Sequence, residues 1–191
     1  MAAKNDQCIT PEMVSRICSG DINAYEEFVR GQWAVAVRTC WLILRNTYDA
    51  EEAAQDAFVS LYRSRDQIKD LNKFHIWFYR ILLNAARQKW RHRPHVLPTP
   101  DLSLSDPDDQ IDQSDTRITV WNAMHSMGRP ERVALILCYF CDLTDREASL
   151  TAGWHLGTYK WRLARGRRQL IRELQGDGHD GRTLKNSLRG E

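Results

Sequence analysis

The chain has 191 residues and a formal net charge of only +2, but its charges are unevenly placed. Residues 1–93 carry 14 basic and 11 acidic side chains, residues 94–117 carry one Arg and six Asp, and residues 118–175 carry nine basic and five acidic side chains. The most apolar run, residues 33–44, is too short to span a bilayer, which needs about 20 apolar residues, and the first residues lack the apolar core of a secretory signal. The sequence therefore argues against direct membrane insertion. It predicts a cytosolic protein with two basic, nucleic-acid-facing parts and an acidic linker between them.

Capping residues predict the first two helices. Thr10 suits an N-cap and is followed by a proline at the first helical position. Gly20 can supply the left-handed residue at the end of this helix. Asp21 is then expected to cap a long helix, which the stretch Asn46 to Tyr48 interrupts.

A third helix, DAEEAAQDAFVSLYRS, is expected to begin at Asp49. Its apolar residues recur at helical spacing and mark a buried face, while its acids fall on the other face. That acidic face suits either a partner or plain solvation, since acids near a helix start also complement the helix dipole.

The segment from Phe74 to Arg93, FHIWFYRILLNAARQKWRHR, contains no acidic residue, and Pro94 ends it. Aromatic rings among cations suit single-stranded DNA, because bases stack on rings while cations neutralise the backbone. The alternative is that the rings serve mainly as core, and for Trp77 we expect a core position. Residues 94–117 contain four prolines and six aspartates, which is typical of an extended linker.

The segment from Asp142 to Arg172 predicts a helix-turn-helix. Thr144 and Glu147 match a capping box, and Gly153 lies where the turn is expected. The second helix, from Leu156 onward, has one apolar face and is otherwise cationic. Such a helix suits the major groove, although a solvated basic surface has the same composition. Residues 176–191 are expected to form a frayed tail.

Other chemistry has weaker support. Cys138-x-x-Cys141 suggests a zinc or redox site, but no second ligand pair follows, so we expect buried structural thiols on an apolar helix. No glycine-rich phosphate loop, paired catalytic carboxylates or nucleophile elbow is present. We therefore expect no catalytic residue, cofactor, metal or small-molecule substrate.

Taken in order, these motifs resemble the extracytoplasmic-function (ECF) group of bacterial RNA polymerase sigma factors in the sigma-70 family. The resemblance covers about residues 10–175. It implies an all-α chain of two helical domains: sigma domain 2 at residues 10–93 and a helix-turn-helix sigma domain 4 at residues 118–175. A flexible acidic linker at residues 94–117 would thread the polymerase, and residues 176–191 would form a flexible tail.

The resemblance also implies partners and sites. The segment from Asp49 to Phe58 matches the part that docks on core RNA polymerase, with candidate contacts Asp49, Glu51, Glu52, Gln55 and Asp56. The loop from Asp66 to His75 and the helix after it match the elements that recognise and open minus-ten promoter DNA, with candidate contacts Asp70, Lys73, Phe74, Arg80, Asn84, Arg87, Lys89 and Arg91. The last helix matches the minus-thirty-five reader, with candidate contacts Thr158, Lys160, Trp161, Arg162, Ala164, Arg165 and Arg168. An anti-sigma factor, often membrane-tethered, is a further expected partner.

The chain departs from the family pattern in its second half. The first helix of the helix-turn-helix carries Ala148, Thr151 and Ala152 where the family usually has large aliphatic residues. We expect Trp154 and Tyr159 to fill the missing volume. The alternative function is a dimeric helix-turn-helix regulator that binds DNA without polymerase; it would need a palindromic site and leaves the segment Phe74 to Arg93 unexplained.

Overall fold

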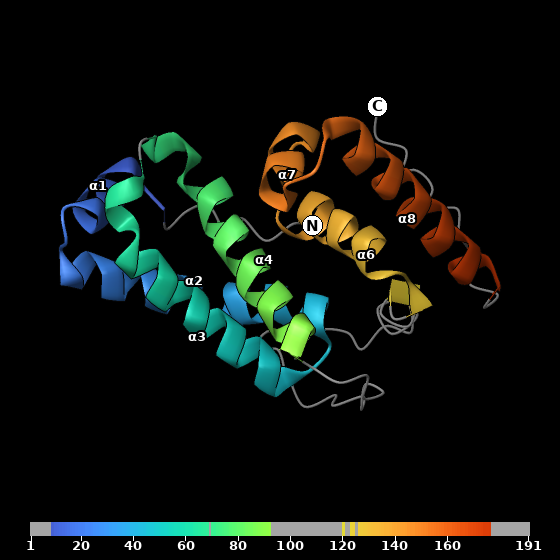
Figure 1. The fold of residues 1–191 in the computed structure, drawn as a ribbon, viewed down its shortest axis with the longest axis horizontal. Helices are drawn as coiled ribbons and strands as arrows, with labels where there is room; N and C mark the ends of the chain where they lie inside the picture. Colours follow the sequence, from blue (N-terminus) through green and yellow to red (C-terminus); the bar gives the residue numbers. More distant parts are fainter. Residues whose placement is uncertain (1–8, 69, 93–119, 121–122, 125, 177–191) are drawn as a thin grey trace.

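In the computed structural model, residues 9–68, 70–92, 120, 123–124 and 126–176 are described, and this part of the chain is helical with no strand. The helices of the first half are α1 (Pro11–Cys18), α2 (Ile22–Leu44), α3 (Thr47–Arg63), η2 (Arg65–Gln67), η3 (Leu71–Lys73) and α4 (Phe74–His92). Those of the second half are α6 (Arg129–Leu135), η4 (Ile136–Phe140), α7 (Asp145–Ala152) and α8 (Leu156–Gly176). Figure 1 shows the first half in blue to green on the left and the second half in gold to red on the right.

The predicted caps define the helix starts. Thr10 accepts a hydrogen bond from the N–H of Met13 at 3.2 Å, and Asp21 caps α2. The helix α3 begins at Thr47 rather than at the predicted Asp49, because the side chain of Asn46 accepts the Asp49 N–H at 2.8 Å and so caps the helix two residues earlier.

An aromatic cluster forms the centre of the first half. The Phe28 ring meets the Phe74 and Phe78 rings edge-on, each with centroids 5.2 Å apart, and Phe58 lies 5.5 Å from Phe78. These rings come from α2, α3 and α4, so they hold the three long helices together. Edge-to-face pairs of this kind stabilise a core by about 0.5–1.5 kcal/mol beyond their burial.

The second half is a helix-turn-helix set on α6. The capping box is confirmed: Thr144 donates its N–H to Glu147 at 2.9 Å and accepts the Glu147 N–H at 3.4 Å. Gly153 turns the chain at φ +68, as expected for glycine. Tyr159 is fully buried and donates its hydroxyl to the carbonyl of Ala134 at 3.2 Å, while Trp154 is half-buried against the same core. Both rings therefore fill core volume, as expected.

One helix differs from its predicted form. The apolar run after Pro130 suggests a single α-helix to Phe140, but its last turn, η4, is a π-helix. The N–H of Cys141 reaches back five residues to the carbonyl of Ile136 at 3.0 Å, and Asp142 then takes φ +51. Hydrophobic periodicity does not distinguish this wider turn from an α-helical one.

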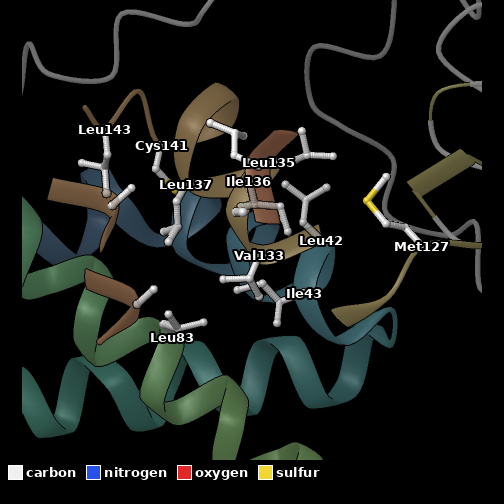
Figure 2. Packing of buried hydrophobic residues seen from close by; sticks show 14 of the residues in the cluster. Leu42, Ile43, Leu83, Met127, Val133, Leu135, Ile136, Leu137, Cys141 and Leu143 are labelled. Atoms are coloured by element: carbon white, nitrogen blue, oxygen red, sulfur yellow. The ribbon is translucent and has the colours of Figure 1, made fainter. Parts of the chain in front are cut away.

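The two halves share one buried cluster. Figure 2 shows Leu42 and Ile43 of α2 and Leu83 of α4 beside the apolar residues of α6 and η4, including Val133 and Leu137. The buried guanidinium of Arg132 donates to the carbonyl of Ile43 at 3.3 Å and to the carbonyl of Met127 at 3.0 Å.

We call this packed state the closed arrangement. The sequence suggests two separate domains, so it does not predict that the two halves share a buried apolar cluster. The proposed domain boundaries remain a prediction, and the linker at residues 94–117 lies outside the described residues.

A close helix crossing gives a test of the fold. A side chain at Gly166 would place its Cβ 3.2 Å from the carbonyl oxygen of Glu131 and 3.2 Å from Cγ of Leu135. We expect Gly166→Leu to lower the free energy of unfolding by roughly 1–3 kcal/mol, because overpacking must push α6 and α8 apart. Chemical denaturation followed by circular dichroism measures this change.

Gly157, on the same helix, is the matched control because nothing lies within 4 Å of a Cβ there. The same substitution at this exposed position should change the stability by no more than about 0.5 kcal/mol. An equal loss of unfolding free energy at Gly157 and Gly166 would contradict the close packing of α6 on α8 at Gly166.

Candidate protein and nucleic-acid interfaces

The exposed face of α3 carries most of the predicted docking acids. Glu51, Glu52, Gln55 and Asp56 are exposed, while four alanines on the other face are fully buried. Asp49 differs: it is 8% exposed and sits in the first turn, where its N–H is capped by Asn46. The structure therefore brings four of the five predicted residues together on one surface and places Asp49 beneath it.

Lys89 of α4 joins this acidic face. Its Nζ lies 2.7 Å from Oε1 of Glu52 and 3.1 Å from Oδ2 of Asp56. Burial acts to lower the pKa of Lys89, but the hydrogen bonds to both carboxylates outweigh it and raise the pKa. A predicted DNA-contacting cation is thus engaged with two predicted docking acids, and it fixes α3 against α4.

Three candidate minus-ten residues lie where the loop meets the start of α4. Asp70 and Lys73 are accessible to solvent, whereas Phe74, the first residue of α4, is buried. Asp70 caps η3 and pairs with Lys73 at 2.8 Å, and the hydrogen bond from Lys73 holds the pKa of Asp70 below its usual range. Phe74 is only 1% exposed and packs on Phe28. In this structure its side chain is part of the core, and its assignment to minus-ten DNA stays a prediction.

The cationic face of α4 is divided between solvent and the second half. Arg80, Asn84 and Arg91 are exposed. Arg87 is half-buried, because α7 packs on this part of α4 and the Arg87 Nη2 donates to the carbonyl of Ala152 at 2.7 Å. Trp77 is half-buried against the aromatic core, so its position agrees with the expected core role.

The exposed face of α8 carries the predicted minus-thirty-five residues. Six of them are exposed: Thr158, Lys160, Trp161, Ala164, Arg165 and Arg168. Trp161 is 54% exposed, and the Arg165 guanidinium lies 5.3 Å from its ring centroid. Arg162 is the exception, half-buried with its guanidinium 4.0 Å from the ring centroid of Trp154.

Two ion pairs border this α8 face. Lys160 lies 3.7 Å from Asp145, and Arg165 lies 3.6 Å from Glu131. Both cations are more than half exposed, so each can also reach a phosphate. The Lys160–Asp145 pair is exposed on both sides and therefore weak, whereas the Glu131 side chain is only 10% exposed. The face as a whole therefore combines exposed cations with one exposed indole ring, which suits contacts to phosphates and base edges.

Sequence reasoning missed Arg129 and the ion contact between His75 and Glu147. The Arg129 guanidinium stacks on Trp90 at 5.0 Å, and His75 Nε2 lies 3.5 Å from Glu147 Oε1. Both contacts join the first half to the second half. Residues that meet only through tertiary packing have no common spacing in the sequence, so no pattern could have indicated them.

The cysteines take two environments. Cys141 is 7% exposed, and burial raises the pKa of its thiol strongly. Cys138 is half-buried, with its sulfur 3.8 Å from the Nη2 of Arg167. Within the described ranges, no group of three or more His, Cys, Asp or Glu side chains is arranged to hold a metal ion. Within those same ranges, no helix combines the length and the apolar character that crossing a membrane requires.

Structural comparison places this fold among sigma factors. CnrH, solved in complex with the cytosolic domain of CnrY, matches with a TM-score of 0.66 at 19% identity, over 87% of this chain and 97% of that chain. RpoE from Bartonella quintana, solved with the anti-sigma factor NepR, has the same TM-score and identity over 78% of this chain and 98% of that chain.

Sequence comparison agrees with this fold. Residues 24–94 match the model of Sigma-70 region 2, which spans α3 and α4. The RNA polymerase sigma-E factor of Streptomyces coelicolor is 25% identical over 171 residues, covering 89% of this chain and 97% of that protein. The ECF RNA polymerase sigma factor SigW of Bacillus subtilis is 24% identical over 177 residues, covering 85% and 95%. Residues 24–94 therefore resemble Sigma-70 region 2, and over most of its length the chain is similar to RNA polymerase sigma factors, extracytoplasmic-function members among them.

Proposed function

We propose that this chain is a sigma factor, which binds core RNA polymerase through the acidic face of α3 and directs promoter-specific initiation through α4 and α8. The observation that carries the proposal is the position of that face. Glu51, Glu52, Gln55 and Asp56 project from a single side of α3, within the stretch that matches Sigma-70 region 2. Exposed carboxylates in such a row suit a basic surface on a partner protein.

We assign minus-thirty-five recognition to α8. It is the second helix of the helix-turn-helix, and this is the element that enters the major groove in such motifs. Lys160, Trp161 and Arg165 occupy the centre of its exposed face. The cations are expected to contact phosphates and guanine edges, and the indole ring is expected to pack on a base or sugar.

We assign minus-ten recognition to α4 and to the loop before it. Arg80, Asn84 and Arg91 are exposed, but Arg87 is engaged with the carbonyl of Ala152. DNA contact along the whole helix therefore requires that α7 move away from α4. Binding to polymerase, which would hold the two halves apart at promoter distance, supplies a reason for that movement.

A protein inhibitor is a further proposed partner. CnrH was solved with the cytosolic domain of CnrY, and the Bartonella quintana RpoE was solved with an anti-sigma factor. By analogy with these complexes, we infer that an anti-sigma factor, tethered to the membrane in some members of this group, controls the present chain. In this function the chain itself performs no covalent chemistry. Two relatives named above are RNA polymerase sigma factors, which favours this function over that of a dimeric regulator.

Run-off transcription with purified core polymerase tests the proposal as a whole. Added to core enzyme, the chain should give transcripts with defined start sites, and sequencing those transcripts would reveal the promoter elements. Core polymerase alone supplies the background. A chain that footprints duplex DNA without polymerase and yields no specific transcript would instead be a conventional regulator.

A charge reversal tests the docking face. Asp56→Arg should weaken binding to core polymerase about tenfold, because it places a cation where an acid is expected to meet a basic surface. Competition with a labelled sigma factor for a limited amount of core enzyme measures the change. Glu26→Arg, at an exposed position of α2, makes the same charge change elsewhere and should have little effect.

Because Asp56 also pairs with Lys89, a second variant separates docking from structure. Lys89→Gln breaks the same ion pair but leaves the acidic face intact. If Lys89→Gln weakened core binding as much as Asp56→Arg does, the loss would come from the α3–α4 contact and not from docking.

A truncation tests the reading face of α8. Arg165→Ala should reduce binding of the holoenzyme to minus-thirty-five DNA by roughly 1–3 kcal/mol if the guanidinium contacts a base. Its ion pair with Glu131 is 3.6 Å long, and the Glu131 side chain is only 10% exposed, so circular dichroism and thermal melting of the variant must show an unchanged fold before the loss is assigned to DNA contact. Arg30→Ala, at an exposed position on α2, is the control for general loss of positive charge. Unchanged promoter affinity in the Arg165 variant would remove this residue from the reading face.

A further inference from the structure

A cationic cleft of about 350 Å³ lies between the two halves of the closed arrangement. Its polar and aromatic lining comes from three places. These are the end of α4, the start of α6, and the second half of the helix-turn-helix, from the turn before α8 into α8 itself. The lining groups that matter here are Arg87, Trp90, Arg91, Arg129, Trp154 and Arg162. The described residues that line this cleft include no carboxylate.

Among the described residues, no acidic partner is found for the four arginines of the cleft. Over the described ranges, none of them has a carboxylate within salt-bridge distance, whereas Lys89 and Arg165 each have one. Burial lowers the pKa of Arg87, and the positive charges of Arg91 and Arg162 lower it further. The cleft therefore concentrates like charges that repel one another, and an anion bound there would relieve this repulsion.

Three of these guanidiniums are held in place. The Arg162 guanidinium stacks on Trp154 at 4.0 Å, the Arg129 guanidinium stacks on Trp90 at 5.0 Å, and Arg87 is fixed by its hydrogen bond to Ala152. A stacked guanidinium keeps its N–H groups at its edges, where they can meet an oxyanion in a bidentate manner. The tryptophans thus orient the cations, which lowers the entropy cost of binding.

We propose that this cleft binds a small polyphosphate anion, either free or carried by a nucleoside. Two or more linked phosphates can meet several guanidiniums at once, whereas a single monovalent anion cannot neutralise four. The volume is at the lower end of the range for small-molecule sites, roughly 300–1,000 Å³, so it suits a compact ligand.

The ligand would also act on the conformation of the protein. Arg87 and Arg91 belong to the first half, while Arg129 and Arg162 belong to the second half. A polyphosphate that bridges them favours the closed arrangement, because it binds this state and not one with the halves apart. This inference concerns the unbound chain and does not depend on polymerase docking or promoter recognition.

Calorimetric titration of the full chain with tripolyphosphate, at constant ionic strength, tests the proposal. We expect saturable binding and a higher melting temperature at saturating ligand. Arg129→Gln should weaken binding about tenfold, as expected for the loss of one charge-assisted contact. Arg129 is exposed and is not among the proposed DNA or polymerase contacts.

The control is Arg30→Gln, which removes an equal charge from the exposed surface of α2. Its affinity should remain within about twofold of the unmodified chain. Equal weakening in the two variants would mean general charge attraction and would overturn the site, as would the absence of saturable binding. Circular dichroism of Arg129→Gln confirms that the variant folds.

A parallel titration with ATP and GTP distinguishes the two sources of the phosphate chain. Tighter binding of a nucleotide than of tripolyphosphate would support a ligand carried by a nucleoside. Equal or weaker binding would support a free polyphosphate. An Arg91→Gln, Arg129→Gln double variant tests the location of the site. If it bound tripolyphosphate, ATP and GTP with unchanged affinity, the cleft would be excluded as the binding site.

Discussion

The contact between the two halves is the constraint on which the rest of the structure depends. Its centre is apolar, but it also buries the charge of Arg132, which is 5% exposed. Burial lowers the pKa of this guanidinium to about 10, with the charges of Arg45 and Arg129 as further causes. The side chain therefore stays charged at neutral pH, and carbonyls from both halves accept its hydrogen bonds. Burying a charge costs free energy that such bonds return only in part, so the closed arrangement contains an unfavourable term that separation would remove.

Small buried residues of α7 lie near this same contact. Ala148, Thr151 and Ala152 are 0%, 1% and 2% exposed. Small side chains let α7 approach α4 closely enough for Arg87 to reach the carbonyl of Ala152. The volume that they leave in the helix-turn-helix is occupied by Tyr159, which is fully buried.

Local signals in the sequence predicted much of the fold. Caps at Thr10, Asp21 and Thr144 act within one turn, and Gly153 needs only its own backbone freedom, so each could be identified without tertiary information. Contacts between distant segments could not. Phe74 follows a polar loop and resembles an exposed aromatic residue until α2 places Phe28 beside it. Lys89 belongs to a run of cations, and only the packing of α3 on α4 shows that it meets two acids.

The difference between local and distant effects also applies to the two cationic surfaces that we propose as DNA contacts. The cationic face of α8 depends on the spacing of residues within one helix, and it is exposed in the closed arrangement. The face of α4 depends on what α7 covers, and Arg87 is withdrawn from solvent there. The closed chain therefore presents most of the cationic face of α8, with Arg162 half-buried, and a smaller part of the face of α4. The closed arrangement offers fewer cations to DNA phosphates than an open one would. Affinity for a duplex rises with the number of phosphates neutralised, so we expect the closed chain to bind DNA more weakly. Separation of the halves would expose the rest of α4 and, in the same movement, disperse the four arginines of the cleft.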